Sequence, residues 1–146
     1  MKVKCKIKTS KEEYFDFIID NVVLEIKKYG HKKVKKENLK KGYTYQKSLF
    51  VKNKKYAAKV IISKLDRPFE YSSITMVSNG KSYRITYVLN DDIVYYYEDV
   101  VDKEGNVLTS VPEIGFGFLK KLSVKKRLRR IGQIINYRKT HEILKP

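Results

Sequence analysis

The 146-residue sequence has few of the residues on which many scaffolds and catalytic sites depend, with one cysteine, two histidines and no tryptophan. A lone cysteine, Cys5, cannot form a disulfide within the chain, so a disulfide framework is excluded and we expect a cytoplasmic location, where thiols stay reduced. The apolar runs, such as residues 22–24 and 60–62, are far shorter than the roughly 18 residues needed to cross a bilayer. The lysine-rich N-terminal segment also lacks the apolar stretch of a signal peptide.

The sequence also has no recognisable catalytic motif. His31 and His141 have no cysteine or histidine at metal-ligand spacing, so the sequence predicts no metal site. The Gly-Phe-Gly segment at residues 115–117 lacks the rest of a phosphate-binding glycine loop, so no nucleotide cofactor is predicted. The carboxylate pairs at 91–92 and 98–99 do not predict acid–base chemistry, because adjacent strand residues point to opposite faces and aspartates are common in turns. We therefore expect a protein that is not an enzyme and needs no cofactor.

Positive charge is what the sequence has in excess, with 33 Lys and Arg against 16 Asp and Glu and a net charge of +17. Residues 1–60 carry 18 basic and 6 acidic side chains, residues 61–115 carry 5 and 9, and residues 116–146 carry 10 and 1. Basic ends are typical of proteins that bind nucleic acid or an anionic membrane. However, 27 of the 33 are lysines, whereas phosphate-binding sites favour the bidentate arginine, so a simply solvated lysine surface is the alternative.

The order of the elements follows from hydrophobic periodicity. Val3, Cys5 and Ile7 alternate with lysines, which predicts a half-buried strand. The spacing of Ser10 and Glu13 is that of a capping box, so a helix should begin there, continue to about residue 28 and end at glycine 30. A short helix within residues 31–41 is expected next. Period-two patterns then predict strands over 43–51, 56–65, 71–78, 82–89 and 93–100, antiparallel because their connections are short. A long amphipathic helix over about 118–139 follows, with a kink or close packing at its internal glycine, residue 132.

This order resembles the helix-grip fold of the SRPBCC or START-like superfamily. The likeness is carried by the Val3-x-Cys5-x-Ile7 strand, which runs into a capped helix with aromatic residues in its first turns. Together with the segment Gly-Tyr-Thr-Tyr-Gln-Lys at 42–47 and the basic C-terminal helix, it is closer still to a bacterial family called domain of unknown function 3284. The resemblance implies a single α+β domain over residues 1–146, in which a curved antiparallel sheet wraps around the C-terminal helix. It also implies a space between them that can hold an apolar ligand, but no activity.

We expect the residues of that space on the alternating apolar positions of the strands and on the apolar stripe of the last helix. A ligand cavity there should reach about 300 Å³ or more. The alternative is that the same side chains simply fill a core. The predicted ligand-binding residues are Val60, Ile62, Ile74, Met76, Tyr83, Ile85, Tyr87, Tyr95, Tyr97, Leu122, Leu128 and Ile131.

A second candidate site is the basic cluster of the C-terminal helix, which we place on the face opposite Leu128, Ile131 and Ile135. It could bind nucleic acid or an anionic membrane. The alternative is a helix whose outer face is merely solvated. The predicted anion-binding residues are Lys125, Lys126, Arg127, Arg129 and Arg130.

Overall fold

The computed structural model of the protein describes residues 1–108 and 116–144, with side chains described for all of these except 51, 116–119 and 142–144. The described part contains six strands, two α-helices and one 3₁₀ turn. In chain order these are β1 (Lys2–Lys6), α1 (Lys11–Gly30), η1 (Lys36–Asn38), β2 (Thr44–Val51), β3 (Lys54–Asp66), β4 (Glu70–Val77), β5 (Ser82–Asn90), β6 (Ile93–Val101) and α2 (Phe116–Leu144). The predicted α+β helix-grip architecture, a curved antiparallel sheet with a long C-terminal helix, is confirmed.

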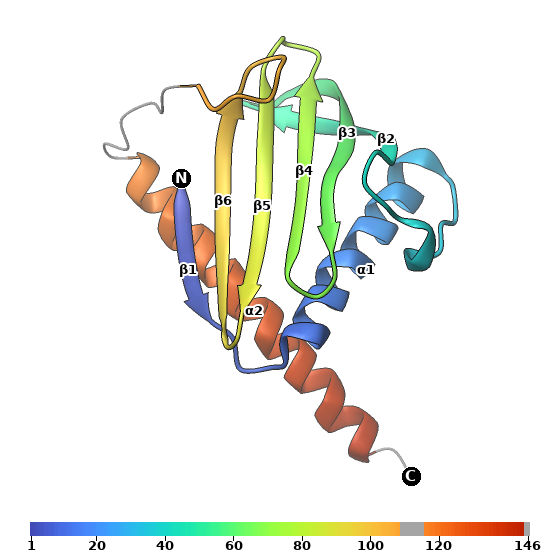
Figure 1. Cartoon of the computed structure of the whole chain (residues 1–146), viewed down its shortest axis with the longest axis vertical. Coiled ribbons are helices and arrows are strands. Elements are labelled where there is room, and N and C mark those ends of the chain that lie inside the picture. Colours follow the sequence, from blue (N-terminus) through green and yellow to red (C-terminus); the bar gives the residue numbers. More distant parts are fainter. Residues whose placement is uncertain (109–115, 145–146) are drawn as a thin grey trace.

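All six strands form one antiparallel sheet in the order β1-β6-β5-β4-β3-β2, so β1 and β2 are its two edges. Both helices lie on the same face of the sheet. In Figure 1, α2 crosses behind β1 and β6, while α1 lies beside β2 and β3. Antiparallel neighbours share a face when they are directly opposite. The register therefore assigns each strand residue either to the concave face beneath the helices or to the convex face.

Helix α1 begins where its sequence predicts. The Ser10 hydroxyl accepts from the Glu13 backbone N–H at 3.1 Å, and the Glu13 carboxylate reaches back to the Ser10 N–H, which completes the capping box. At the other end the helix includes Gly30, and it is His31 that adopts the left-handed conformation (φ 51°) that ends it. Glycine was the expected terminator because it takes positive φ without steric cost, but here His31 adopts that conformation instead.

The core lies between the concave face and the two helices. Tyr14 and Phe15 of α1, Ile62 of β3, Val94 of β6 and Leu128 of α2 are all essentially inaccessible to solvent. The Tyr14 hydroxyl donates to the main-chain carbonyl of Leu128 at 2.9 Å and so connects the two helices inside the core. Neither helix, over the residues described, has an apolar stretch long enough to span a membrane.

Candidate functional site

A pocket of about 240 Å³ opens between α1, the middle of the concave face and α2; we call it the grip pocket. The lining combines apolar side chains with hydroxyl, amide and charged groups. Its lining residues are Ile18, Asn21, Val22 and Glu25 of α1, Tyr45 and Lys47 of β2, Val60 of β3, Tyr71, Ser73 and Thr75 of β4, Ile85 and Tyr87 of β5, and Ile131 of α2. Its volume is below the 300 Å³ that we expected, so it suits a small ligand.

A hydrogen-bonded carboxylate connects α1 to β2 in the lining of the grip pocket. The Tyr45 hydroxyl donates to Glu25 Oε2 at 2.5 Å, and Lys47 Nζ lies 2.9 Å from Glu25 Oε1. Burial and the hydrogen bond to Glu25 raise the pKa of the Tyr45 phenol above its usual value, so it stays a hydrogen-bond donor at neutral pH. The carboxylate and the ammonium neutralise each other, and the lining therefore offers polar groups without a net charge.

Phenols from the sheet also contribute to this polar lining. Tyr71 and Tyr87 are directly opposite each other on β4 and β5. Burial raises the pKa of both phenols above the usual value of a tyrosine. The Tyr87 ring packs edge-on against Tyr96 of β6, with ring centroids 5.2 Å apart. The grip pocket thus combines neutral hydrogen-bonding groups with the aliphatic side chains of α1, β3 and α2.

The structure brings four of the predicted ligand-binding residues into the grip pocket: Val60, Ile85, Tyr87 and Ile131. Ile62 and Leu128 are fully buried core residues that do not line it. Tyr83 lies on the concave face, opposite Thr75, but outside the pocket lining. That any of these residues binds a ligand stays a prediction.

Four others were assigned to the wrong face. Ile74 is opposite Arg84, and Met76 is opposite Ser82, on the convex face. Lys2 Nζ lies 5.5 Å and 5.6 Å from the ring centroids of Tyr95 and Tyr97, which also places these tyrosines on the convex face. The prediction for β4 relied on apolar character, but over residues 73–76 the concave positions are Ser73 and Thr75 and the convex ones are Ile74 and Met76.

Leu122 is the fifth correction, because it is half exposed, with 51% of its surface accessible, and lies away from the sheet. Among the described side chains of α2, the buried apolar ones are Val124, Leu128, Ile131 and Ile135, a three-to-four spacing to which Leu122 does not belong.

The sequence analysis did not identify the polar residues that line the grip pocket. Tyr71, Ser73 and Thr75 occupy alternate positions of β4, so the period of two predicts that they share one face of the sheet. They were overlooked because the prediction selected mainly apolar residues for the concave face. On α1, Glu25 follows Ile18 and Val22 at helical spacing, which puts it on the same side of the helix. Tyr45 belongs to the segment that carries the family resemblance, yet nothing in the sequence pairs it with Glu25.

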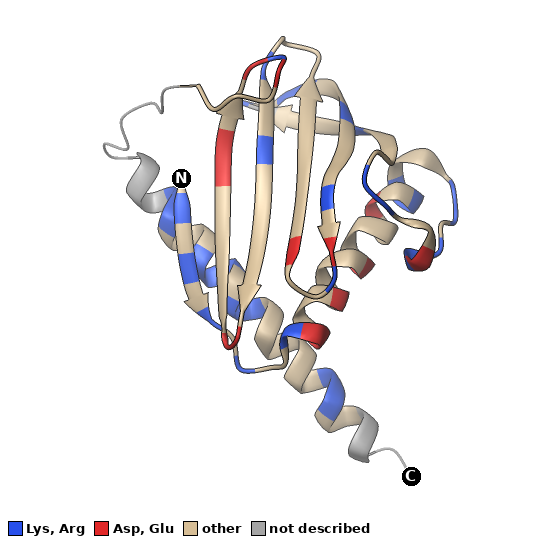
Figure 2. Ribbon diagram, viewed as in Figure 1, with Lys and Arg blue, Asp and Glu red and all other residues tan. Residues whose placement is uncertain are grey.

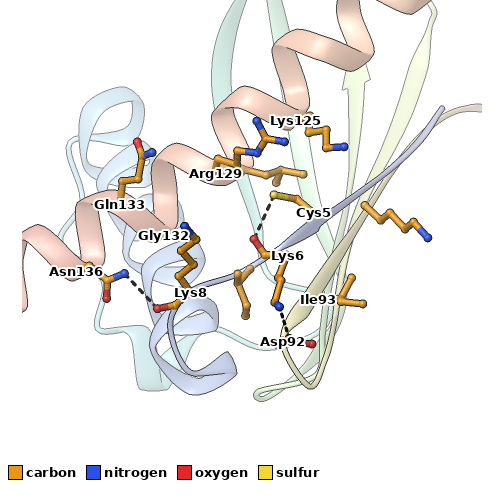
Figure 3. Close-up of a pocket in the computed structure, with 13 residues that line it drawn as sticks. Cys5, Lys6, Lys8, Asp92, Ile93, Lys125, Arg129, Gly132, Gln133 and Asn136 are labelled. Carbon is orange, nitrogen blue, oxygen red and sulfur yellow. Dashed lines mark hydrogen bonds and ion pairs between the residues drawn. The ribbon is translucent and has the colours of Figure 1, made fainter.

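A larger hollow of about 740 Å³ lies between β1 and α2; we call it the edge groove (Figure 3). Lys4 to Lys8 of the β1 segment form one wall, and Asp92 and Ile93 lie beside them at the start of β6. The other wall is α2, with Lys125, Leu128, Arg129, Gly132, Gln133 and Asn136. Cys5 is 4% exposed and its thiol donates to the Lys6 carbonyl at 3.4 Å, in agreement with a structural role.

The residues of the predicted anion-binding cluster point in different directions around α2. Lys125 and Arg129 line the edge groove, whereas Lys126 and Arg130 are exposed and lie outside its lining. Arg127 turns toward the sheet, where its guanidinium carbon lies 5.2 Å from the centroid of the Tyr96 ring. The five residues therefore do not form one face, because Arg127 lies about 160° around the helix from Arg129 at 100° per residue rotation.

Among the described residues, no group of three or more His, Cys, Asp or Glu side chains is arranged to hold a metal ion. Sheet, helices and pocket together define a protein of helix-grip architecture with a small internal pocket. The chain belongs to the family described as Domain of unknown function (DUF3284), which matches residues 1–106. That match covers β1 to β6 and α1 but not α2.

The fold also has a counterpart among solved structures. The crystal structure of protein CV1439 from Chromobacterium violaceum is similar, with a TM-score of 0.54 and 12% sequence identity, over 84% of this chain and 91% of that one. At this identity the likeness concerns the fold alone. No curated protein matches the chain significantly.

Proposed function

We propose that this protein binds a small amphipathic molecule in the grip pocket and acts as a binding protein rather than as an enzyme. The observation that carries the proposal is the mixed lining, in which aliphatic side chains of α1, β3, β5 and α2 occur together with phenols, hydroxyls and the Glu25–Lys47 pair. Small-molecule sites commonly combine an apolar wall with a few fixed polar groups. The resemblance to the SRPBCC superfamily, in which this space holds apolar ligands, supports the same assignment.

The lining also limits the chemistry of the ligand. The charges of Lys47 Nζ and Glu25 Oε1, which lie 2.9 Å apart, cancel each other. A charged ligand would therefore gain little binding energy from this pair. Tyr71, Tyr87 and Ser73 supply neutral hydrogen-bonding groups. The volume of 240 Å³ is below that of typical drug-sized sites, so the ligand is a compact, uncharged molecule with an apolar body and a hydroxyl or carbonyl group. We place this binding in the cytoplasm, since a chain with one cysteine cannot form the internal disulfides that small secreted domains commonly use.

The test measures binding of an uncharged fluorescent dye to a variant in which a larger side chain fills the grip pocket. Ile85→Trp adds a large ring inside the grip pocket, and Ile74→Trp makes the same change at a half-buried position on the convex face. N-phenyl-1-naphthylamine is a suitable probe because it carries no charge that the basic surface would attract. We expect its fluorescence to rise with the unaltered protein and with Ile74→Trp, and to fall several-fold with Ile85→Trp.

Native mass spectrometry of the purified protein gives an independent readout. A co-purified compound would appear as extra mass that disappears on denaturation, and Ile85→Trp should abolish it. If the dye binds equally to both variants and no extra mass is present in the unaltered protein, the grip pocket is a filled core and the proposal fails.

A further inference from the structure

The outer edge of β1 presents unpaired main-chain groups to the edge groove. The Ile7 N–H donates to Asp92 O at 2.7 Å, and the Glu98 N–H donates to Met1 O at 2.9 Å, at the two ends of the β1–β6 pairing. In an antiparallel pair, hydrogen-bonded residues alternate with residues whose main chain points away. The odd-numbered residues of β1 therefore bond to β6, and the N–H groups of Lys4 and Lys6 point outward. Over the described residues, neither of these N–H groups has a protein acceptor.

Helix α2 contacts the β1 segment at Lys8, at the C-terminal end of its outer edge. Asn136 Nδ2 donates to the Lys8 carbonyl at 3.1 Å. Gly132 faces the same residue, since a Cβ placed on it would lie 3.9 Å from the Lys8 nitrogen. The 740 Å³ edge groove lies between these two elements, and Lys4 is among its lining residues. A strand paired with β1 would lie about 4.8 Å from its outer edge, next to residues 4–8, which line this groove.

The charge of the edge groove is one-sided. Its lining includes Lys4, Lys6, Lys8, Lys125 and Arg129, and its one carboxylate is Asp92. Asp92 lies 3.7 Å from Lys6 and so neutralises one of the five cations. Figure 2 shows the basic residues of β1 and of the adjacent part of α2 on facing elements. An occupant would therefore meet positive charge from both walls.

We infer that the edge groove binds an acidic, extended segment of a partner protein, which adds to the sheet as a seventh strand beside β1. The outward main-chain groups of β1, which include the N–H groups of Lys4 and Lys6, would supply main-chain hydrogen bonds, as in other cases of strand addition. Alternate side chains of the added strand point toward α2. Acidic residues at those positions would meet Lys125 and Arg129.

Charge excludes a second copy of this chain from the edge groove. Self-pairing would set the lysines of β1 against one another, and like charges directly opposite across strands are destabilising. Edge lysines commonly prevent such pairing, so here they select for a partner of opposite charge. A phosphate backbone fits less well than a peptide, because phosphates accept hydrogen bonds and would be repelled by the outward carbonyls of β1.

The experiment uses a synthetic peptide as the probe, acetylated and amidated, with glutamate and valine alternating over nine residues. A strand places all of its glutamates on one face. A second peptide of the same sequence, N-methylated at alternate residues, keeps the charge but cannot donate along one edge. We expect the first peptide to bind with a dissociation constant that rises with added salt, and the N-methylated peptide to bind at least tenfold more weakly.

Two charge reversals on neighbouring residues locate the site. Arg129→Glu changes a residue of the edge groove, and Arg130→Glu makes the same change at an exposed position outside its lining. We expect the dissociation constant to rise at least tenfold with Arg129→Glu and less than threefold with Arg130→Glu. Amide hydrogen exchange at Lys4 and Lys6 should also slow when the peptide is bound, because both N–H groups gain an acceptor.

Three results would overturn the inference: equal weakening by both variants, equal affinity for the two peptides, or unchanged exchange at Lys4 and Lys6. Tighter binding of a single-stranded oligonucleotide, again without slowed exchange, would assign the basic surface to nucleic acid instead. Ile85→Trp should leave peptide binding unchanged, so failure here and failure of the grip-pocket proposal can be told apart.

Discussion

At the scale of single residues, Tyr14 illustrates how a polar atom can be used in the core. The side chain is fully buried, and its hydroxyl donates to the Leu128 carbonyl at 2.9 Å. A buried hydroxyl without a partner costs free energy, so this bond both satisfies the phenol and fixes α1 against α2. Burial raises the pKa of the phenol far above its usual value, so it remains a donor over the physiological range.

We expect Tyr14→Phe to lower the free energy of unfolding by about 1 kcal/mol, since it removes this hydrogen bond and keeps the ring. Urea unfolding followed by circular dichroism measures the change. Tyr137→Phe, at a position with 63% of its surface exposed, is the matched control and should change it by less than about 0.5 kcal/mol. Equal effects of the two substitutions would contradict the assigned role of the Tyr14 hydroxyl.

At the scale of elements, different sides of α2 contact different neighbours. Val124, Leu128, Ile131 and Ile135 are buried against the sheet and α1. One flank, with Lys125 and Arg129, borders the edge groove. On the other flank, Lys120 Nζ lies 2.9 Å from Glu98 of β6, and Arg138 lies over the Phe17 ring of α1. The basic residues of this helix therefore have distinct roles that a count of charges cannot separate.

Gly132 gives a prediction for α2 itself. Glycine within a helix costs about 1 kcal/mol relative to alanine. A Cβ at this position would lie 3.9 Å from the Lys8 nitrogen, which is ordinary van der Waals contact. We therefore expect Gly132→Ala to stabilise the protein by roughly 0.5–1 kcal/mol, measured as a rise in the urea midpoint with an unchanged slope. The larger Gly132→Leu should destabilise it, because its branch would meet the β1 segment.

The fold could be predicted from the sequence wherever periodicity and burial agree. The capping box at Ser10 and the alternation of β1 gave the correct elements because each local pattern matches the packing that it meets. The candidate site was predicted less well, since the lining of the grip pocket breaks the rule that apolar residues face inward. On β4, Ser73 and Thr75 face the grip pocket while Ile74 faces away. The Glu25–Tyr45 contact joins residues 20 positions apart and needs the folded chain to be seen.

At the scale of the whole molecule, the helices and the sheet are connected by polar contacts at one end as well as by the core. Lys139 of α2 lies 3.1 Å from Glu13 of α1, and Asn136 bonds to the Lys8 carbonyl. Hydrogen bonds from Lys139 and from Ser10 lower the pKa of the Glu13 carboxyl. This carboxylate stabilises the fold above its unfolded pKa of about 4.3, and the contribution is lost as the pH falls through its lower folded value.

Buried phenols throughout the core determine how the stability of the fold falls at alkaline pH. Burial raises the pKa of Tyr96 to about 12, and it raises the pKa values of Tyr14, Tyr45, Tyr71 and Tyr87 as well. In the unfolded chain each phenol ionises near pH 10. Above that pH the unfolded state loses protons that the folded state retains, so the free energy of unfolding must fall as the pH rises.

We expect the free energy of unfolding to decrease steeply between about pH 10 and 12, with each of the five phenols adding up to about 1.4 kcal/mol per pH unit. Urea unfolding at a series of pH values measures the slope, and the difference in phenolate absorbance at 295 nm between the unaltered protein and a Tyr→Phe variant at each of the five positions reports ionisation of the substituted phenol. Their ionisation should coincide with loss of the circular dichroism signal. Tyr71→Phe should reduce the slope by about one proton, because it removes a phenol whose pKa is raised by burial. If the five phenols ionise while the protein stays folded, the core is more open to water than this packing requires.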